Sequence, residues 1–358
     1  MYFLMNLVLR DGDFSLQLCK DALMLSYIRK FYTKVLKDHH QSVPIKSIED
    51  FAKTSVSYEQ RVANELWTFD EKPRDVDTGH ESSVGNHFVL EFLVLERRLS
   101  ACDGKDLWSY AVNFINNRSF TKVLSIGSGT CAVEMEIAQQ LESEYVIDCL
   151  DLNEKLINWA TTTAKQKGLN LNPLVGDLNT LNIVEGYDLI IAMSCLHHFV
   201  ELEELFKKVN LALKQDAEFI TYEPVCRSGM FLFKRQRLLL AILFLLLPKR
   251  LRVNHQDYPG QKPVNRFYNE YDRSGWTFEC IRSGDIPALL RANFNVKHYG
   301  RGMTFLRRVS DSLYGPNYDW TNRTDRLVGK SLMVIDRVVR KLHLSPVEGL
   351  FFIGSKIK

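Results

Sequence analysis

The 358-residue sequence predicts an α/β fold in which a mostly parallel sheet carries helices on both faces. From Thr121 onward, short apolar runs alternate with amphipathic helical patterns, which is typical of successive β-α-β units. Glycines interrupt the first junction between such a run and a helix. Two later apolar runs, Phe294–Gly300 and Gly349–Ile357, add an antiparallel closing pair, so we expect seven strands.

Residues 1–118 precede the sheet and are expected to form a helical N-terminal cap. The segment "LCKDALMLSYIRKFYTKVL" spaces its apolar residues at roughly helical intervals, and "HFVLEFLVLERRL" predicts a second helix. The polar stretch between these two segments is broken by Pro73, Gly79 and Gly85, which predicts a loop.

Residues 119–225 contain the pattern of the parallel sheet and form the predicted core domain. Its five expected strands are Lys122–Gly127, Tyr145–Asp151, Asn172–Val175, Tyr187–Met193 and Glu218–Tyr222. The expected helices between them are Ala132–Glu142, Glu154–Lys167 and Leu202–Leu213. Crossovers between parallel strands are right-handed, so we expect a ligand crevice beyond the carboxyl ends of the strands.

The remainder of the chain is expected to complete the sheet and to add two insertions. Residues 226–278 are interpreted as a lid inserted over the crevice. Residues 279–358 are expected to supply the closing strands together with a second, largely helical insertion, Arg301–Val347.

The first insertion combines an apolar run with basic residues. No acidic residue occurs between Pro224 and Gln256, and seven Lys and Arg residues surround the run "LLLAILFLLL". A ten-residue helix is about 15 Å long, half of what a bilayer core requires, so the run does not predict a transmembrane segment. It predicts either a cap helix buried against the N-terminal helices, or an interfacial helix through which residues 231–252 contact an anionic membrane.

Composition limits the classes of function. Charged residues make up 25% and hydrophobic ones 46% of the chain, as in ordinary globular proteins. A net charge of +3 is too small to predict a nucleic-acid partner. The seven cysteines are scattered without a C-x-x-C pair, so we predict neither disulfides nor a metal site. The first residues lack a basic leader, and we expect a cytoplasmic protein with peripheral contact, at most, at the inner membrane surface.

The glycine turn "VLSIGSGT" predicts a bound nucleotide or nucleoside. Gly127 and Gly129 let a ligand approach the backbone at the start of a helix, where N–H groups are available. With Ala132 they also match the fingerprint of dinucleotide-binding proteins. The alternative is a glycine turn that only tight packing requires.

Two aspartates favour a nucleoside cofactor over a dinucleotide. Asp151 ends the second predicted strand, 22 residues beyond Gly129, where a carboxylate can accept both ribose hydroxyls. Asp177 follows the third strand and can accept from an adenine amine, while the Leu178 N–H faces the ring. A dinucleotide does not need the second carboxylate. The set therefore predicts S-adenosyl-L-methionine (SAM).

Residues Thr121–Val225 resemble the core of class I SAM-dependent methyltransferases, with its Rossmann-like seven-stranded sheet. The motifs "VLSIGSGT", "CLDLNEKLINWA", "GDLN" and "YDLIIAMSCLHHF" carry the resemblance. The flanking segments resemble a bacterial group of methyltransferases associated with polysaccharide and glycan assembly. The resemblance implies that the cofactor contacts Ser125, Gly127, Ser128, Gly129, Asp151, Leu152, Asp177, Leu178, Met193 and Ser194.

The sequence departs from this family at two positions of the first motif. The family usually has an acid where Ser125 stands and a third glycine where Cys131 stands. We therefore expect backbone carbonyls, or an acid from the N-terminal cap, to contact the amino group of the cofactor.

Candidate catalytic residues follow the fourth and fifth strands. His197, His198 and Glu223 lie at the expected rim of the crevice, where a base near an acceptor hydroxyl contributes about 10²–10⁴-fold to the rate. Glu279 and Arg282 are candidates for binding a polar substrate, with a salt bridge that anchors the lid as the alternative.

Two histidines of the N-terminal loop, His80 and His87, are weaker candidates for closing over the site.

The predicted reaction is O-methylation of a saccharide or related polar metabolite, an acceptor class that follows from the resemblance alone. Methylation of a lipid or another small molecule is the alternative enzyme, because the inserted lid is apolar. A non-catalytic SAM-binding accessory protein is the alternative of another class, favoured by Ser125 and by the lack of an obvious base. An NAD-dependent oxidoreductase is the last alternative.

Overall fold

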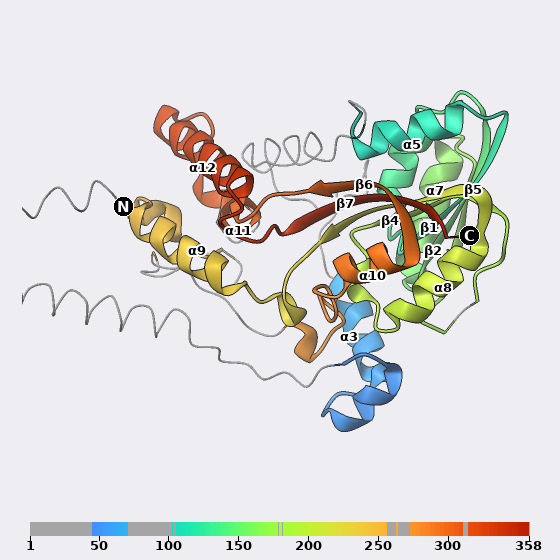
Figure 1. Ribbon diagram of the computed structural model, residues 1–358, viewed down its shortest axis with the longest axis horizontal. Coiled ribbons are helices and arrows are strands. Elements are labelled where there is room, and N and C mark those ends of the chain that lie inside the picture. The colour runs from blue at the N-terminus through green and yellow to red at the C-terminus, as the bar shows by residue number, and fades with distance from the viewer. Residues whose placement is uncertain are drawn as a thin grey trace, which may run out of the picture.

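A computed structural model describes residues 45–70, 102, 105–177, 179–180, 182–255, 263, 273–310 and 314–357. Within this part of the chain a central sheet carries helices on both faces, and a smaller helical unit lies beyond one end of it (Figure 1). The expected helices within residues 1–44 and 87–99 lie outside the described residues.

The sheet has seven strands in the order β3-β2-β1-β4-β5-β7-β6. The strands are β1 (Phe120–Ile126), β2 (Glu144–Asp151), β3 (Leu171–Val175), β4 (Tyr187–Met193), β5 (Leu213–Pro224), β6 (Phe294–Arg301) and β7 (Gly349–Lys356). The pairs formed among β1 to β5 are all parallel, whereas β7 runs antiparallel to both β5 and β6. The predicted fold class, a mostly parallel seven-stranded sheet with an antiparallel closing strand, is confirmed.

Alternation along the strands divides the core into two apolar layers. Leu124, Ile190 and Phe352 face one layer, while their neighbours Val123, Leu189 and Phe351 face the other. The first layer is covered by α8 (Leu202–Ala212) and α10 (Ile286–Asn293). The second is covered by α5 (Leu107–Asn116), α6 (Ala132–Ala138) and α7 (Glu154–Gln166). Both faces of the sheet are therefore covered by helices and shielded from solvent, as is usual for parallel sheets.

The described N-terminal residues form a 3₁₀ helix (Ile48–Lys53) and α3 (Tyr58–Asp70). Phe51 packs with Val200, Phe278 and Ile281 in a small apolar cluster of its own. Arg61 lies on the buried side of α3 and donates to the carbonyl oxygen of Thr277 at 2.9 Å. These contacts fix α3 against the segment that precedes α10.

The two insertions pack against each other to form a second hydrophobic core. It joins α9 (Lys234–Leu246) and the 3₁₀ helix Lys249–Arg252 to α11 (Leu306–Ser310) and α12 (Arg323–Lys341). Figure 1 places α9, α11 and α12 together, beyond the end of the sheet where β6 ends and β7 begins. We refer to these helices as the helical subdomain.

Polar contacts also hold the helical subdomain together. Gln236 of α9 donates to the carbonyl oxygen of Thr304 at 2.6 Å and so links the two insertions. Within the second insertion, Asp336 of α12 accepts hydrogen bonds from the backbone N–H groups of Thr304, Phe305 and Leu306. Within the described ranges, no helix combines the length and the apolar character that crossing a bilayer demands.

Candidate functional site

An open cavity of about 830 Å³ lies at the carboxyl ends of the strands, where the sequence predicts the crevice. This volume includes space that is open to solvent. The strand ends contribute Gly127, Gly129, Leu150, Asp151, Leu152, Asn153, Gly176, Asp177, Asn179, Ser194, Cys195, His198 and Phe199. Leu156 of α7 and Phe278 complete this side, and α3 adds Glu65, Leu66 and Phe69.

The two glycines of the turn after β1 are required for different reasons. Both have positive φ, +61° at Gly127 and +54° at Gly129. A Cβ atom on Gly127 would lie 2.5 Å from Cβ of Cys195, so packing alone demands glycine there. A Cβ atom on Gly129 would meet only Leu156, at 3.9 Å. Gly129 therefore leaves its backbone accessible from the cavity, as a close ligand requires.

The two predicted cofactor aspartates lie in the wall of the cavity and already accept local hydrogen bonds. Asp151 accepts from the N–H of Gly129 at 2.7 Å and from the N–H of Asn153 at 2.8 Å. Burial raises the pKa of the Asp151 carboxyl group above its ordinary value, and these two N–H groups oppose that rise. Each carboxylate oxygen has two acceptor positions, so Asp151 can still accept from ribose hydroxyls.

Asp177 is held by groups from two directions. It accepts from the backbone N–H of Asn179 at 2.9 Å and from the phenol of Tyr58 at 2.5 Å. Burial, together with the charge of Asp177, raises the pKa of Tyr58. Tyr58 begins α3, so the N-terminal segment takes part in shaping the adenine side of the predicted site.

Ser125 lies beneath the glycine turn and not among the residues that line the cavity. Its hydroxyl donates to Oε1 of Glu134 on α6 at 2.5 Å, and both side chains are buried. Burial raises the pKa of Glu134 to about 7. An acid is thus present under the turn, on α6, but it does not line the cavity. The expectation that backbone carbonyls or an acid of the N-terminal cap contact the amino group of the cofactor stays a prediction, and Glu65 of α3 is an acid of that segment that lines the cavity.

Two further predicted cofactor residues, Ser128 and Met193, are likewise absent from the cavity wall. The hydroxyl of Ser128 is buried, and Met193 packs against the apolar layer under α5, α6 and α7. Leu152 and Ser194 do line the cavity. Leu178 lies outside the described residues, as do His80 and His87.

Of the three candidate catalytic residues, only His198 lines the cavity. It ends the 3₁₀ helix Leu196–His198, and its Nδ1 lies 2.6 Å from Oε1 of Glu65 on α3. Burial alone would lower the pKa of His198, but the charge of Glu65, aided by Glu279 and Glu223, raises it to about 9.

His197 and Glu223 are buried and hold this 3₁₀ helix in place through hydrogen bonds. Oε1 of Glu223 accepts from the N–H groups of Cys195 and Leu196, both at 2.8 Å. Its Oε2 lies 2.9 Å from Nδ1 of His197. Glu223 is fully buried, so it fixes the backbone between β4 and His198 and does not reach a ligand in the cavity.

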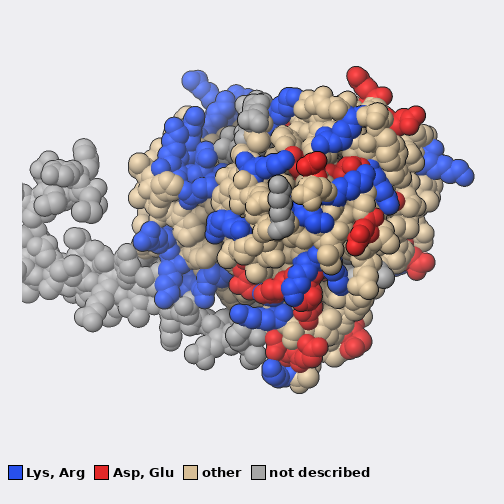
Figure 2. Space-filling view, turned by 45° about the vertical axis from the view of Figure 1, so that its right-hand side comes forward, with Lys and Arg blue, Asp and Glu red and all other residues tan. Residues whose placement is uncertain are grey.

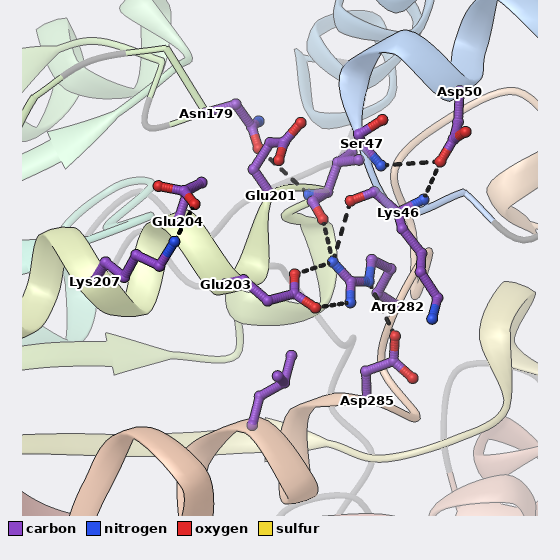
Figure 3. A network of polar contacts seen from close by, with 12 residues as sticks. Lys46, Ser47, Asp50, Asn179, Glu201, Glu203, Glu204, Lys207, Arg282 and Asp285 are labelled. Carbon is purple, nitrogen blue, oxygen red and sulfur yellow. Dashed lines mark hydrogen bonds and ion pairs between the residues drawn. The ribbon is translucent and has the colours of Figure 1, made fainter.

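The two candidate substrate residues lie in different environments. Arg282 binds both carboxylate oxygens of Glu203, at 2.6 and 2.7 Å, and donates to the carbonyl of Val200 and to Asp285 (Figure 3). It also reaches the carbonyl of Lys46 at 3.2 Å. This arrangement favours the anchoring alternative, with the N-terminal segment as the part that is anchored. Glu279 instead faces the histidine pair, as described below.

Of the expected lid, residues 226–278, Phe278 lines the cavity, whereas α9 and the 3₁₀ helix after it do not. The N-terminal segment lines the cavity through three residues of α3, which the sequence analysis did not single out. The signal for α3 is weak because Arg61 and Glu65 occupy its buried side and disguise the apolar pattern.

Residues 123–216, about a quarter of the chain, match the model of a protein family described as a methyltransferase domain. A search of curated proteins finds no match.

Three solved structures illustrate the likeness of the fold. A SAM-dependent methyltransferase from Aquifex aeolicus is 17% identical, with 38% of this chain and 72% of that chain covered and a TM-score of 0.31. A protein from Pyrococcus horikoshii is 15% identical, with 70% and 88% covered and a TM-score of 0.38. TehB from Haemophilus influenzae is 12% identical, with 70% and 62% covered and a TM-score of 0.37.

The matched residues run from β1 into β5 and contain the glycine turn, both aspartates and the histidine pair. They hold most of the cavity wall described above. The chain therefore contains a class I methyltransferase domain, and its cofactor is S-adenosyl-L-methionine.

Proposed function

We propose that this protein transfers the methyl group of SAM to a hydroxyl of a saccharide or related polar metabolite. The observation that carries the proposal is the cavity itself, which has Asp151 and Asp177 in its wall together with His198. The glycan-associated acceptor class follows from the sequence resemblance, and the polar groups beside His198 agree with it.

The residues of the cavity fit the cofactor. Gly129 leaves backbone accessible, Asp151 retains acceptor positions for ribose hydroxyls, and Asp177 does so for the adenine amine. When bound, SAM supplies a methyl carbon that its sulfonium centre activates toward nucleophiles. The chain's contribution is then to align the acceptor and to exclude water, for which proximity is the large term.

The acceptor side of the cavity combines apolar walls with polar groups. Phe69, Phe199 and Phe278 provide the surfaces that exclude water. His198 and Glu65 are the polar side chains nearest to each other in this wall, and Glu65 holds the imidazole in place. We assign to His198 the contact with the acceptor hydroxyl, and to His197 and Glu223 the positioning of its backbone.

Two measurements test this function. Calorimetry with SAM, S-adenosylhomocysteine and NAD(H) separates the cofactors, and we expect micromolar binding of the first two and none of the nicotinamide. Mass spectrometry after incubation with SAM and candidate sugars, lipids and small metabolites then identifies the product. A methylated lipid would favour the alternative acceptor class. Tight SAM binding without transfer of labelled methyl groups to any component of a cell extract would favour the accessory protein.

We further propose that the helical subdomain contacts an anionic membrane surface. Near the end of α9, Ile242, Leu245 and Leu246 are exposed, the last to 77%. A stripe along α12 is also apolar and exposed, formed by Leu327, Val334, Val338 and Leu342. Figure 2 shows Lys and Arg side chains gathered on the side of the molecule where α9 and α12 lie. Apolar side chains flanked by basic ones suit an interfacial position.

Flotation with vesicles tests this second proposal. We expect binding to phosphatidylglycerol vesicles that weakens with added salt, and none to phosphatidylcholine vesicles. Replacing Leu245 and Leu246 by serine should reduce binding. Val184→Ser, which removes an equally exposed apolar side chain elsewhere, should leave it unchanged. Absence of flotation with the anionic vesicles would remove the proposal.

A further inference from the structure

Three side chains with metal-binding groups converge beside the cavity. His197, His198 and Glu279 each place one ligand atom within 4.8 Å of the others. The histidines are consecutive on the 3₁₀ helix after β4, whereas Glu279 comes from the segment before α10. Residues more than 80 positions apart in the chain are thus brought close together by the fold.

The separations between these groups exceed those of hydrogen bonds. Nε2 of His197 lies 3.8 Å from Oε1 of Glu279, and Nε2 of His198 lies 3.9 Å from Oε2. An N–H···O hydrogen bond ends near about 3.2 Å. Ligand atoms about 2.1 Å from one tetrahedral ion are about 3.4 Å apart. The two measured separations are somewhat longer than this, and the three ligand atoms lie within 4.8 Å of one another, so an ion fits between the groups once the side chains move closer together.

The orientation of both imidazoles is an independent observation. Nδ1 of His197 makes a 2.9 Å hydrogen bond with Glu223. Nδ1 of His198 lies 2.6 Å from Glu65 as an ion pair without hydrogen-bond geometry. Metal-binding histidines usually donate one ring N–H to a carboxylate, which leaves the lone pair of the other nitrogen for the ion. Here a carboxylate beside each Nδ1 leaves both Nε2 atoms on the side of Glu279. His197 is only 4% exposed, so this orientation is held by packing as well.

We propose that His197, His198 and Glu279 bind a divalent transition-metal ion such as Zn²⁺ at the edge of the cofactor cavity. Two imidazoles and one carboxylate form a donor set of catalytic zinc sites, which keep one coordination position open. His198 lines the cavity, and so does Phe278, the neighbour of Glu279. An ion held here would lie beside the cavity, and it would take the place of the His198 ring nitrogen as the group that meets an oxygen of a polar acceptor. That role rests on the proposed function, whereas the metal site itself does not.

The test is titration of the chelator-treated full chain with ZnCl₂ alone, followed by calorimetry and by competition with a chromophoric chelator. We expect one ion per chain. Glu279→Gln and His197→Gln should each weaken binding at least tenfold. His343→Ala, which removes an exposed histidine of another region, should bind as the unaltered protein does. Cobalt substitution gives a second readout, because visible absorption bands of bound Co²⁺ should be lost in Glu279→Gln.

A positioning residue provides a further check. Glu65→Gln keeps the shape of the side chain but removes the charge that holds His198, and it should weaken Zn²⁺ binding about 10–100-fold. Circular dichroism and thermal unfolding, measured on the same samples, report whether each variant is folded. For a variant that fails this control, Glu279→Asp retains the carboxylate and should bind Zn²⁺ measurably but more weakly.

Two results would overturn the metal site. One is the absence of stoichiometric binding at millimolar ZnCl₂, and the other is equal affinity in the unaltered protein and in both Glu279→Gln and His197→Gln. If the unaltered protein does not bind S-adenosylhomocysteine, the cofactor site is contradicted, whereas the proposal of the metal site is unaffected.

Discussion

Glu134 carries a carboxyl group that the fold buries completely under the glycine turn. Its hydrogen-bond partner is the hydroxyl of Ser125, and the charge of Asp151 acts on it from the cavity side. Burial raises the pKa of Glu134 from 4.5 to about 7. A carboxyl group with a raised pKa stabilises the folded state fully below pH 4.5, and this contribution is lost as the pH rises through about 7.

Glu134→Gln should therefore change the pH dependence of unfolding. Because of this shift in the pKa of Glu134, the free energy of unfolding of the unaltered protein falls by about 3 kcal/mol between pH 4.5 and pH 8. We expect the glutamine variant to gain stability relative to the unaltered protein over the same range, measured by urea unfolding at several pH values. Glu136→Gln on the same helix serves as the control. Parallel pH profiles for Glu134→Gln and the unaltered protein would contradict the assignment.

Asp151 connects the glycine turn to the ligand side of the cavity, so its replacement separates folding from binding. Asparagine can still accept from the N–H of Gly129 but offers no charge to ribose hydroxyls. Hydrogen bonds to charged groups contribute about 1.5–3 kcal/mol, so Asp151→Asn should raise the Kd for S-adenosylhomocysteine about 10–100-fold. Isothermal titration calorimetry measures this. Asp188→Asn, on β4 away from the cavity, should bind normally, and an unchanged Kd in Asp151→Asn would exclude the proposed ribose contact.

At the scale of elements, α3 belongs to the cofactor wall although it lies 50 residues before β1. The segment that leads into α3 is tied to the core by Arg282, which donates to the carbonyl group of Lys46 as well as to Glu203 and the carbonyl group of Val200. Arg282 is buried, whereas Glu203 and Asp285 are about half exposed. Removal of the arginine thus leaves no buried carboxylate but deprives two carbonyl groups of a donor.

Arg282→Met should loosen the N-terminal segment. We expect a loss of about 2 kcal/mol in unfolding free energy, since several hydrogen bonds to one charged group disappear. Limited proteolysis should cut within residues 45–70 faster than in the unaltered protein, and binding of S-adenosylhomocysteine should weaken. Lys207→Met removes an exposed ion pair with Glu204 in the same region (Figure 3) and should change none of these quantities. Unaltered proteolysis of Arg282→Met would show that other contacts hold α3.

Some elements could be predicted from the sequence because local patterns determine them. Strands β1, β2 and β4 are apolar runs that end at Ile126, Asp151 and Met193, within a residue of prediction. The start of β5 could not be placed, because its first residue, Leu213, pairs with Tyr187 across an irregularity in register. Helix α6 ends at Ala138, earlier than predicted, although residues up to Glu142 continue its polar pattern.

The residues of the candidate site also fall into two groups, those that a local sequence motif predicts and those that only tertiary contacts bring to the site. Gly129, Asp151, Asp177 and His198 follow directly from strand-end motifs, and the structure places all four at the cavity. Tyr58, Glu65 and Glu134 reach the site through tertiary contacts over 9 to 133 residues of sequence, which no short motif records. The same holds for Glu279, whose approach to the histidines depends on the path of the chain before α10.

At the scale of the whole molecule, the sheet and the helical subdomain have separate apolar cores. Among the described residues, those that line the cavity come from the sheet, its flanking segments and α3, and none from α9, α11 or α12. Binding of the cofactor should therefore be insensitive to damage inside the subdomain. Asp336 offers a specific way to introduce such damage, because its Oδ1 accepts four hydrogen bonds from residues 304–306.

Asp336→Ala should destabilise the helical subdomain without changing the cofactor site. The substitution leaves the first N–H groups of α11 buried without their acceptor, which costs about 2–4 kcal/mol when several such groups are affected. We expect thermal unfolding to begin at a lower temperature, while the Kd for S-adenosylhomocysteine stays within a factor of two. Asp216→Ala, a change at an exposed aspartate of β5, should leave both quantities unaltered. A large loss of cofactor affinity in Asp336→Ala would mean that the two cores act as one cooperative unit, and the helices at 226–255 and 303–341 would then belong to the functional site.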